Sequence, residues 1–179
     1  SGSQQILDDL TQYRDSIQFM WDQTVRGINK GLNISEITEL VRLPQKYENR
    51  YFTQQFYGLV EHHVRQIHNG LRGWFDGDES ALFPLPASKR AKKLIDGFGG
   101  VEKVRQEITK ALKEDDLRWA LELATWLIRR EVNENDQSGG GETKDRNQLA
   151  SILRKIGQRT TSTNVRNWCL TRVLELEGK

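Results

Sequence analysis

Apolar residues recur every three or four positions along most of this chain, which is the spacing of one face of an α-helix. The longest such stretch covers about residues 4 to 29. Its apolar residues are Ile6, Leu10, Tyr13, Ile17, Met20, Trp21 and Ile28. At 1.5 Å per residue this helix would be roughly 40 Å long, and a helix of that length often extends beyond its own core. No segment alternates with a period of two, so the pattern predicts an all-α fold without a sheet.

Glycine, proline and capping residues divide the rest of the chain into further helices. Gly31 ends the first helix, and Asn33 to Glu36 resembles a capping box before a short helix that ends near Leu43 at a proline. Longer helices are expected at about 49–72, from Ser88 to about 96, and as a pair over 101–112 and 117–128 with an acidic turn at 115–116. Two more, around 149–156 and 165–176, close the chain.

Small residues at the expected helix contacts, Ala120 and Ala124, favour a helical array of antiparallel hairpins of the tetratricopeptide type. A clean repeat of 34 residues is not visible. The polar, glycine-rich stretch over about 133–145 predicts a mobile loop. The first three residues, 1–3, have the composition of a remnant of an expression vector, so we expect one domain over 4–179.

Composition excludes several classes of function. The 27 Lys and Arg residues nearly balance the 25 Asp and Glu residues, so no strong basic excess favours nucleic acid. The basic cluster at 89–93 opens a predicted helix; a solvated face is the favoured interpretation, and a phosphate-binding site is the alternative. No apolar run approaches the roughly 18 residues of a membrane span. The single cysteine, Cys169, excludes an intrachain disulfide and lies among apolar residues, which indicates a buried thiol.

The three histidines, His62, His63 and His68, fall in one predicted helix and raise the question of a metal site. Two ligands on one helical face need a separation of three or four, whereas the gaps here are one, five and six. No second group of His, Cys or paired carboxylates supplies the missing ligands. We therefore predict no metal site in this chain.

The same helix carries a polar stripe opposite its apolar residues. Its members span about 100° of the helical wheel at 100° per residue. They are Gln55, Gly58, His62, Arg65, Gln66 and Asn69. One interpretation is a solvent face, and the other is a wall that faces a cleft. In a cleft His62 could exchange a proton near neutral pH and Arg65 could hold an anion.

Several motifs, in consistent order over nearly the whole chain, are similar to one known family. They are Tyr13-Arg14-Asp15, residues 24–31, Tyr57-Gly58, His62, residues 73–77, residues 82–85, Gly99-Gly100, residues 119–124 and residues 164–168. In these motifs the chain resembles the dimerisation domain of linear (type III) alkyl sulfatases, which belong to the metallo-β-lactamase superfamily. Differences from the family pattern, such as His63 and His68, leave the physiological ester open.

The resemblance implies a helical domain whose arms exchange between two subunits of a homodimer, a role that suits the long first helix. It implies a parent enzyme that hydrolyses alkyl sulfate esters with two zinc ions in a separate catalytic domain, and a sterol-carrier-like domain after this one. The His-x-His-x-Asp-His zinc signature is absent here, so this chain alone is expected to hold no cofactor and to hydrolyse nothing.

The resemblance also gives individual residues a role. His62 matches a proton donor of the family, and Arg65, Tyr57 and Asn69 are the expected substrate-binding residues of the same wall. The alternative from the helical pattern alone is a free-standing tetratricopeptide-like module that binds other proteins. The sequence leaves the compartment open between bacterial cytoplasm and periplasm.

Overall fold

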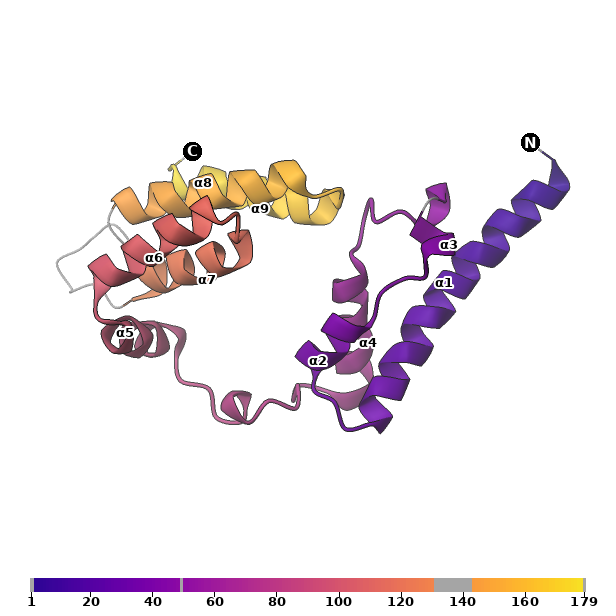
Figure 1. The fold of residues 1–179 in the computed structure, drawn as a ribbon, viewed down its shortest axis with the longest axis horizontal. Coiled ribbons are helices and arrows are strands. Elements are labelled where there is room, and N and C mark those ends of the chain that lie inside the picture. The colour runs from indigo at the N-terminus through magenta and orange to yellow at the C-terminus, as the bar shows by residue number, and fades with distance from the viewer. Residues whose placement is uncertain (1, 49, 131–142, 179) are drawn as a thin grey trace. The chain divides into compact units, whose positions relative to one another are not determined.

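The computed structural model describes residues 2–48, 50–130 and 143–178. Within these ranges it contains nine α-helices and two short 3-10 helices and no strand (Figure 1). The prediction of an all-α fold is thereby confirmed. The chain forms two compact units: one consists of Ser1–Pro84 and Thr161–Thr163, the other of Leu85–Thr160 and Asn164–Lys179. We call them unit 1 and unit 2.

Unit 1 is built on the long first helix. Its elements are α1 (Ser3–Asn29), α2 (Ile34–Leu40), α3 (Gln45–Glu48), a 3-10 turn (Tyr51–Thr53), α4 (Val60–Arg72) and a second 3-10 turn (Glu79–Ala81). α1 and α2 both pack against α4. The core between them is small, with Ile37, Val41 and Val64 buried and Phe19, Ile28, Leu32 and Val60 packed around them.

The local signals at the start of unit 1 are confirmed. Gly31 follows α1 with a φ of +74°, a conformation that glycine adopts without strain. The backbone N–H of Glu36 donates to the Asn33 side chain at 3.0 Å, and the backbone N–H of Asn33 donates to the Glu36 carboxylate at 2.8 Å. This reciprocal pair is the predicted capping box at the start of α2.

The predicted helix over 49–72 is wrong in nearly its first half, because α4 begins only at Val60. Residue 49 lies outside the described residues, and 54–59 are not helical. The Gln55 side chain accepts a hydrogen bond from the backbone N–H of Val60 at 2.8 Å. This bond satisfies a backbone N–H group in the first turn of α4, which would otherwise need a carbonyl acceptor from a preceding turn of helix. Gln55, Phe56 and Gly58 therefore do not belong to the helical stripes that the sequence predicted.

Unit 2 contains α5 (Ala87–Phe98), α6 (Val101–Lys113), α7 (Leu117–Arg129), α8 (Thr143–Arg159) and α9 (Thr163–Leu176). α7 packs against α5, α6 and α8. The core is much larger than that of unit 1, and Val104, Ile108, Leu123 and Leu127 in it have no exposed surface. Phe98, Trp119 and Trp126 form an aromatic cluster at its edge, with ring centroids 5.6–6.5 Å apart.

The boundaries in unit 2 follow most of the predicted signals. Asp116 caps α7 by accepting a hydrogen bond from the backbone N–H of Trp119 at 3.0 Å. Gly99 and Gly100, with φ of +100° and +96°, separate α5 from α6. Ser88 does not cap α5, because the helix begins one residue earlier, after Pro86.

The predicted loop over 133–145 is contradicted at its end, since residues 143–145 form the first turn of α8. Asp145 is buried there by an ion-pair network that fixes this turn. The remaining part, 133–142, lies outside the described residues. Of residues 1–3, Ser3 already belongs to α1 and Ser1 lies outside the described part. None of the helices in the described ranges is both long and apolar enough to cross a membrane.

Candidate functional site

α4 is amphipathic, and its polar side carries three of the four residues that the sequence selected. Val60, Val64, Ile67 and Leu71 occupy one side, with Val64 fully buried. His62, Arg65 and Asn69 lie opposite, within about 60° on the helical wheel. His62 and Asn69 are exposed and Arg65 is half-buried. Three side chains that can donate hydrogen bonds, one of them cationic, therefore share an accessible face of unit 1.

Tyr57, the fourth selected residue, lies outside the helix. It belongs to the irregular segment before α4, and its side chain is 74% exposed. Its backbone carbonyl accepts a hydrogen bond from the Ser162 hydroxyl, while the Thr161 hydroxyl donates to the Gln55 carbonyl at 3.0 Å. The segment is thus held through its backbone, but helical spacing does not place the Tyr57 ring beside His62.

A cavity between α1 and α4 was not foreseen from the sequence. It has a volume of about 300 Å³, and its lining includes Tyr13, Ile17 and Trp21 of α1 and His63 and Gln66 of α4. Gly58 lies beside it and leaves room for the His63 ring, since a Cβ atom at that position would lie 2.4 Å from Nε2 of His63 and the ring would have to move. The one feature of the sequence that pointed to this cavity was Gly58, a single glycine before the helix that carries the histidines.

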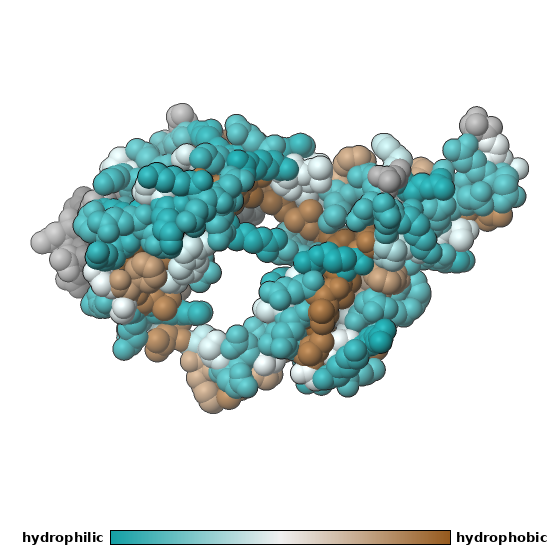
Figure 2. Space-filling model, viewed as in Figure 1, coloured by the Kyte–Doolittle hydropathy of each residue, from teal (hydrophilic) through white to brown (hydrophobic). Residues whose placement is uncertain are grey.

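α1 exposes a row of large apolar side chains. Their exposed fractions range from 45% to 59%. They are Ile6, Leu7, Leu10, Tyr13, Ile17 and Trp21, and we call this row the α1 apolar face. The spacing of three and four keeps them on one side of the helix. In Figure 2 the brown hydrophobic side chains of unit 1 are most visible over its α2 and α4 part.

The three histidines do not converge. His68 is only 3% exposed, whereas His62 and His63 are exposed. In the part of the chain that the structure describes, no group of His, Cys, Asp and Glu side chains has the arrangement of a metal site.

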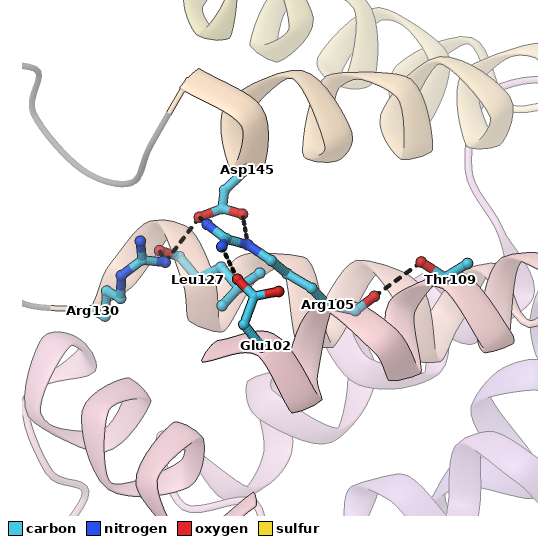
Figure 3. A network of polar contacts seen from close by, with 6 residues as sticks. All are labelled: Glu102, Arg105, Thr109, Leu127, Arg130 and Asp145. Atoms are coloured by element: carbon cyan, nitrogen blue, oxygen red, sulfur yellow. Dashed lines mark hydrogen bonds and ion pairs between the residues drawn. The ribbon is translucent and has the colours of Figure 1, made fainter. Parts of the chain in front are cut away.

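The densest charge cluster lies in unit 2 and centres on Asp145 (Figure 3). Arg105 donates to both carboxylate oxygens, from Nε at 2.8 Å and from Nη2 at 2.9 Å. Arg130 donates from Nη1 to Oδ2 of Asp145 at 3.0 Å and to the carbonyl of Leu127 at 2.8 Å. Glu102 pairs with Arg105 from the outer side. The network joins α6, the end of α7 and the start of α8.

Two buried groups in unit 2 have pKa values that depart from the ordinary ones. Burial alone would raise the pKa of Asp145, but the hydrogen bonds from Arg105 and Arg130 outweigh it and hold that pKa below its ordinary value. Burial raises the pKa of the Cys169 thiol, which is 3% exposed. This confirms the prediction of a buried thiol and opposes a role as nucleophile, because the thiolate is the reactive form. Both groups are structural.

Comparison with known proteins identifies the same family over most of the chain. The family model described as "Alkyl sulfatase dimerisation" matches residues 33–179. A linear primary-alkylsulfatase of a Pseudomonas strain is 38% identical over the whole chain, and an alkyl/aryl-sulfatase of Saccharomyces cerevisiae is 29% identical over 98% of it. The solved structure of a stereoselective inverting sec-alkylsulfatase from Pseudomonas matches 93% of the chain, with a TM-score of 0.82 and 25% identity.

These relatives are much longer than this chain. It spans 33% of the Pseudomonas primary-alkylsulfatase and 26% of the yeast enzyme. The similarity therefore concerns one segment of each enzyme. Because the family model covers well over half of the sequence, the chain belongs to the alkyl sulfatase dimerisation family.

Proposed function

We propose that this chain is the dimerisation segment of a zinc-dependent alkyl sulfatase, and that the polar face of α4 forms one wall of the active site in the parent enzyme. The α1 apolar face is the observation that carries the first half of the proposal. The second half rests on His62, Arg65 and Asn69 sharing an accessible face while no described residues of this chain form a metal site.

A contiguous row of exposed apolar residues is unusual for a monomeric protein and typical of an interface. Six large side chains, each about half exposed, leave much apolar area on α1 in contact with water. A two-fold dimer would bury the same row from both subunits, because an isologous interface uses the same patch twice. We therefore expect α1 to lie at the dimer interface, where an exchange of arms between subunits would also place it.

Light scattering on the chain tests this half. Leu10 is 58% exposed, so Leu10→Glu should leave the helix content measured by circular dichroism unchanged. The variant should nevertheless shift the molar mass from that of a dimer to that of a monomer, because a carboxylate would be buried without a partner. Gln5→Glu, an exposed position on a different side of α1, should remain dimeric. A monomeric wild-type chain at high concentration would contradict the proposal and favour the free-standing interaction module.

The wall of the active site is tested in the full-length parent. If His62 donates a proton to the leaving group, His62→Asn should lower kcat by roughly 10²-fold or more, with the zinc content unchanged. Arg65→Gln should mainly raise KM, because a guanidinium beside the sulfate contributes to binding the anion. Lys113→Gln, an exposed cation at the end of α6 in unit 2, is the control and should leave both constants unchanged. Wild-type kinetics for His62→Asn would remove His62 from the mechanism.

A further inference from the structure

Unit 2 contains a groove that neither the α4 face nor the α1 apolar face accounts for. It runs between α5 and α7 and has a volume of about 420 Å³. Apolar side chains from both helices line it, namely Leu94 from α5 and Leu121 and Trp126 from α7. All three are only partly buried. Sites for small organic ligands have this size and this mixture of an apolar lining with a few polar groups.

Arginines surround this apolar lining. Arg90 comes from α5, and Arg118 and Arg129 come from α7. Glu122 is the one acidic residue among the lining residues, so three cations face one anion. Arg90 and Arg129 are exposed, and neither forms an ion pair with any other residue that the structure describes. The groove therefore combines an apolar interior with an excess of positive charge.

The sequence explains why these residues meet. Arg118, Glu122, Thr125 and Arg129 follow one another at intervals of three and four, which places them in one stripe along α7. On α5, Arg90 precedes Leu94 by four residues and lies beside Ala91, which is 2% exposed. A small residue at this contact lets the two helices approach closely. Arg118 and Arg129 are separated by about 16 Å along the helix axis, at 1.5 Å per residue.

We propose that this groove binds a single-chain amphiphile with an anionic headgroup, its alkyl chain on Leu94, Leu121 and Trp126 and its headgroup on the exposed guanidinium groups of Arg90 and Arg129. Guanidinium groups bind planar or tetrahedral oxyanions through two parallel hydrogen bonds, so both sulfate and carboxylate headgroups fit. An inorganic anion would leave the apolar lining in water, and a neutral lipid would leave the arginines unused. The proposal concerns unit 2 alone and holds whether or not α1 forms a dimer.

Calorimetric titration with octyl and decyl sulfate, both below their micelle concentrations, tests the alkyl part. Decyl sulfate should bind roughly 15-fold more tightly than octyl sulfate, the gain expected from burying two more methylene groups. Sodium sulfate and decyltrimethylammonium should not bind. Decanoate against decyl sulfate then shows which headgroup the arginines prefer. Circular dichroism at each end point must show the native helix content, and unfolding by the probe at these concentrations would overturn the proposal.

Variants locate the site. Arg90→Gln and Arg129→Gln should each weaken decyl sulfate binding by about tenfold, the effect of losing one charged hydrogen-bonding partner. Lys89→Gln removes the same charge from the same helix at an exposed position outside the groove, and should bind as the wild type does. Equal losses in Arg90→Gln and Lys89→Gln would indicate unspecific attraction and overturn the proposal. So would affinity that does not depend on chain length, or tighter binding of an acidic peptide than of decyl sulfate.

Discussion

Asp145 shows how a single side chain fixes the start of a helix. Its carboxylate has no exposed surface, and the side chains of Arg105 and Arg130 are only 11% and 14% exposed. A carboxylate buried without a partner would be very costly, but here both oxygens accept hydrogen bonds from guanidinium groups (Figure 3). Since Arg105 lies 40 residues earlier in the chain, the network joins segments that no local signal connects.

Replacing Asp145 should therefore destabilise unit 2 strongly. Asp145→Asn keeps the shape but removes the buried negative charge that Arg105 and Arg130 share, and the free energy of unfolding should fall by about 3 kcal/mol. Urea denaturation gives this value. Asp115→Asn is the matched control, because the Asp115–Arg159 pair is more than half exposed on both sides and should contribute less than about 1 kcal/mol. Similar losses in the two variants would mean that the network does not hold α8.

The same carboxylate predicts a loss of stability in acid. The pKa of Asp145 lies below that of an unfolded aspartate, about 3.9, so the unfolded chain takes up the proton first as the pH falls. The contribution of the ion pairs is complete above about pH 5 and decreases as the pH falls below about 4. The difference in unfolding free energy between wild type and Asp145→Asn should shrink over this range in urea titrations. A difference that stays constant down to about pH 3 would contradict the assignment.

At the scale of elements, two glycines in helices of unit 1 should respond to alanine in opposite ways. A Cβ atom on Gly27 of α1 would lie 2.7 Å from Cγ1 of Ile37, which is buried in the α1–α2 contact. Gly27→Ala should therefore cost about 1–3 kcal/mol through overpacking. A Cβ atom on Gly70 of α4 meets nothing within 4 Å, so Gly70→Ala should stabilise the helix by about 0.5–1 kcal/mol. Thermal unfolding of both variants shows whether each one is more or less stable than the wild type. A change in the same direction for both would refute the packing of Gly27 against Ile37.

The helix boundaries that sequence predicted well depend on neighbouring residues. The Asn33–Glu36 capping box and the Asp116 cap act over three residues, so a short window of sequence contains all the information. The boundaries that it missed depend on less regular contacts. α4 starts at Val60 because the Gln55 side chain reaches its backbone, and α8 starts at Thr143 beside the pairing of Asp145 with distant arginines.

The candidate sites also divide into those that neighbouring residues determine and those that depend on distant contacts. His62, Arg65 and Asn69 could be assigned to one face because helical spacing alone decides it, and the structure agrees. Tyr57 could not, because its position depends on an irregular segment held by hydrogen bonds to residues 161 and 162. Both the cavity beside His63 and the groove between α5 and α7 take their linings from segments that lie apart in the sequence. Neither could be found before the helices were packed.

At the scale of the whole chain, the two units differ in how much core each contains. Among the residues that the structure describes, unit 2 buries fifteen hydrophobic residues in one cluster, whereas the cluster in unit 1 has three. Burial of apolar surface is the main source of stability in a folded unit. Unit 1 therefore has less internal stabilisation, although its first helix carries a second apolar surface that a partner subunit would cover.

This difference predicts that dimerisation stabilises the two units unequally. If the α1 apolar face forms the interface, unit 1 loses its partner whenever the dimer dissociates. In a tight dimer the fraction of monomer is inversely proportional to the square root of the protein concentration. Amide hydrogen exchange through the monomer should then slow roughly tenfold between ~1 and ~100 µM in α1 and in α4, which packs against it. Exchange in α6 and α7 should change little, because the core of unit 2 does not depend on a partner. Leu10→Glu should abolish the concentration dependence in unit 1, and its persistence in that variant would place the interface elsewhere.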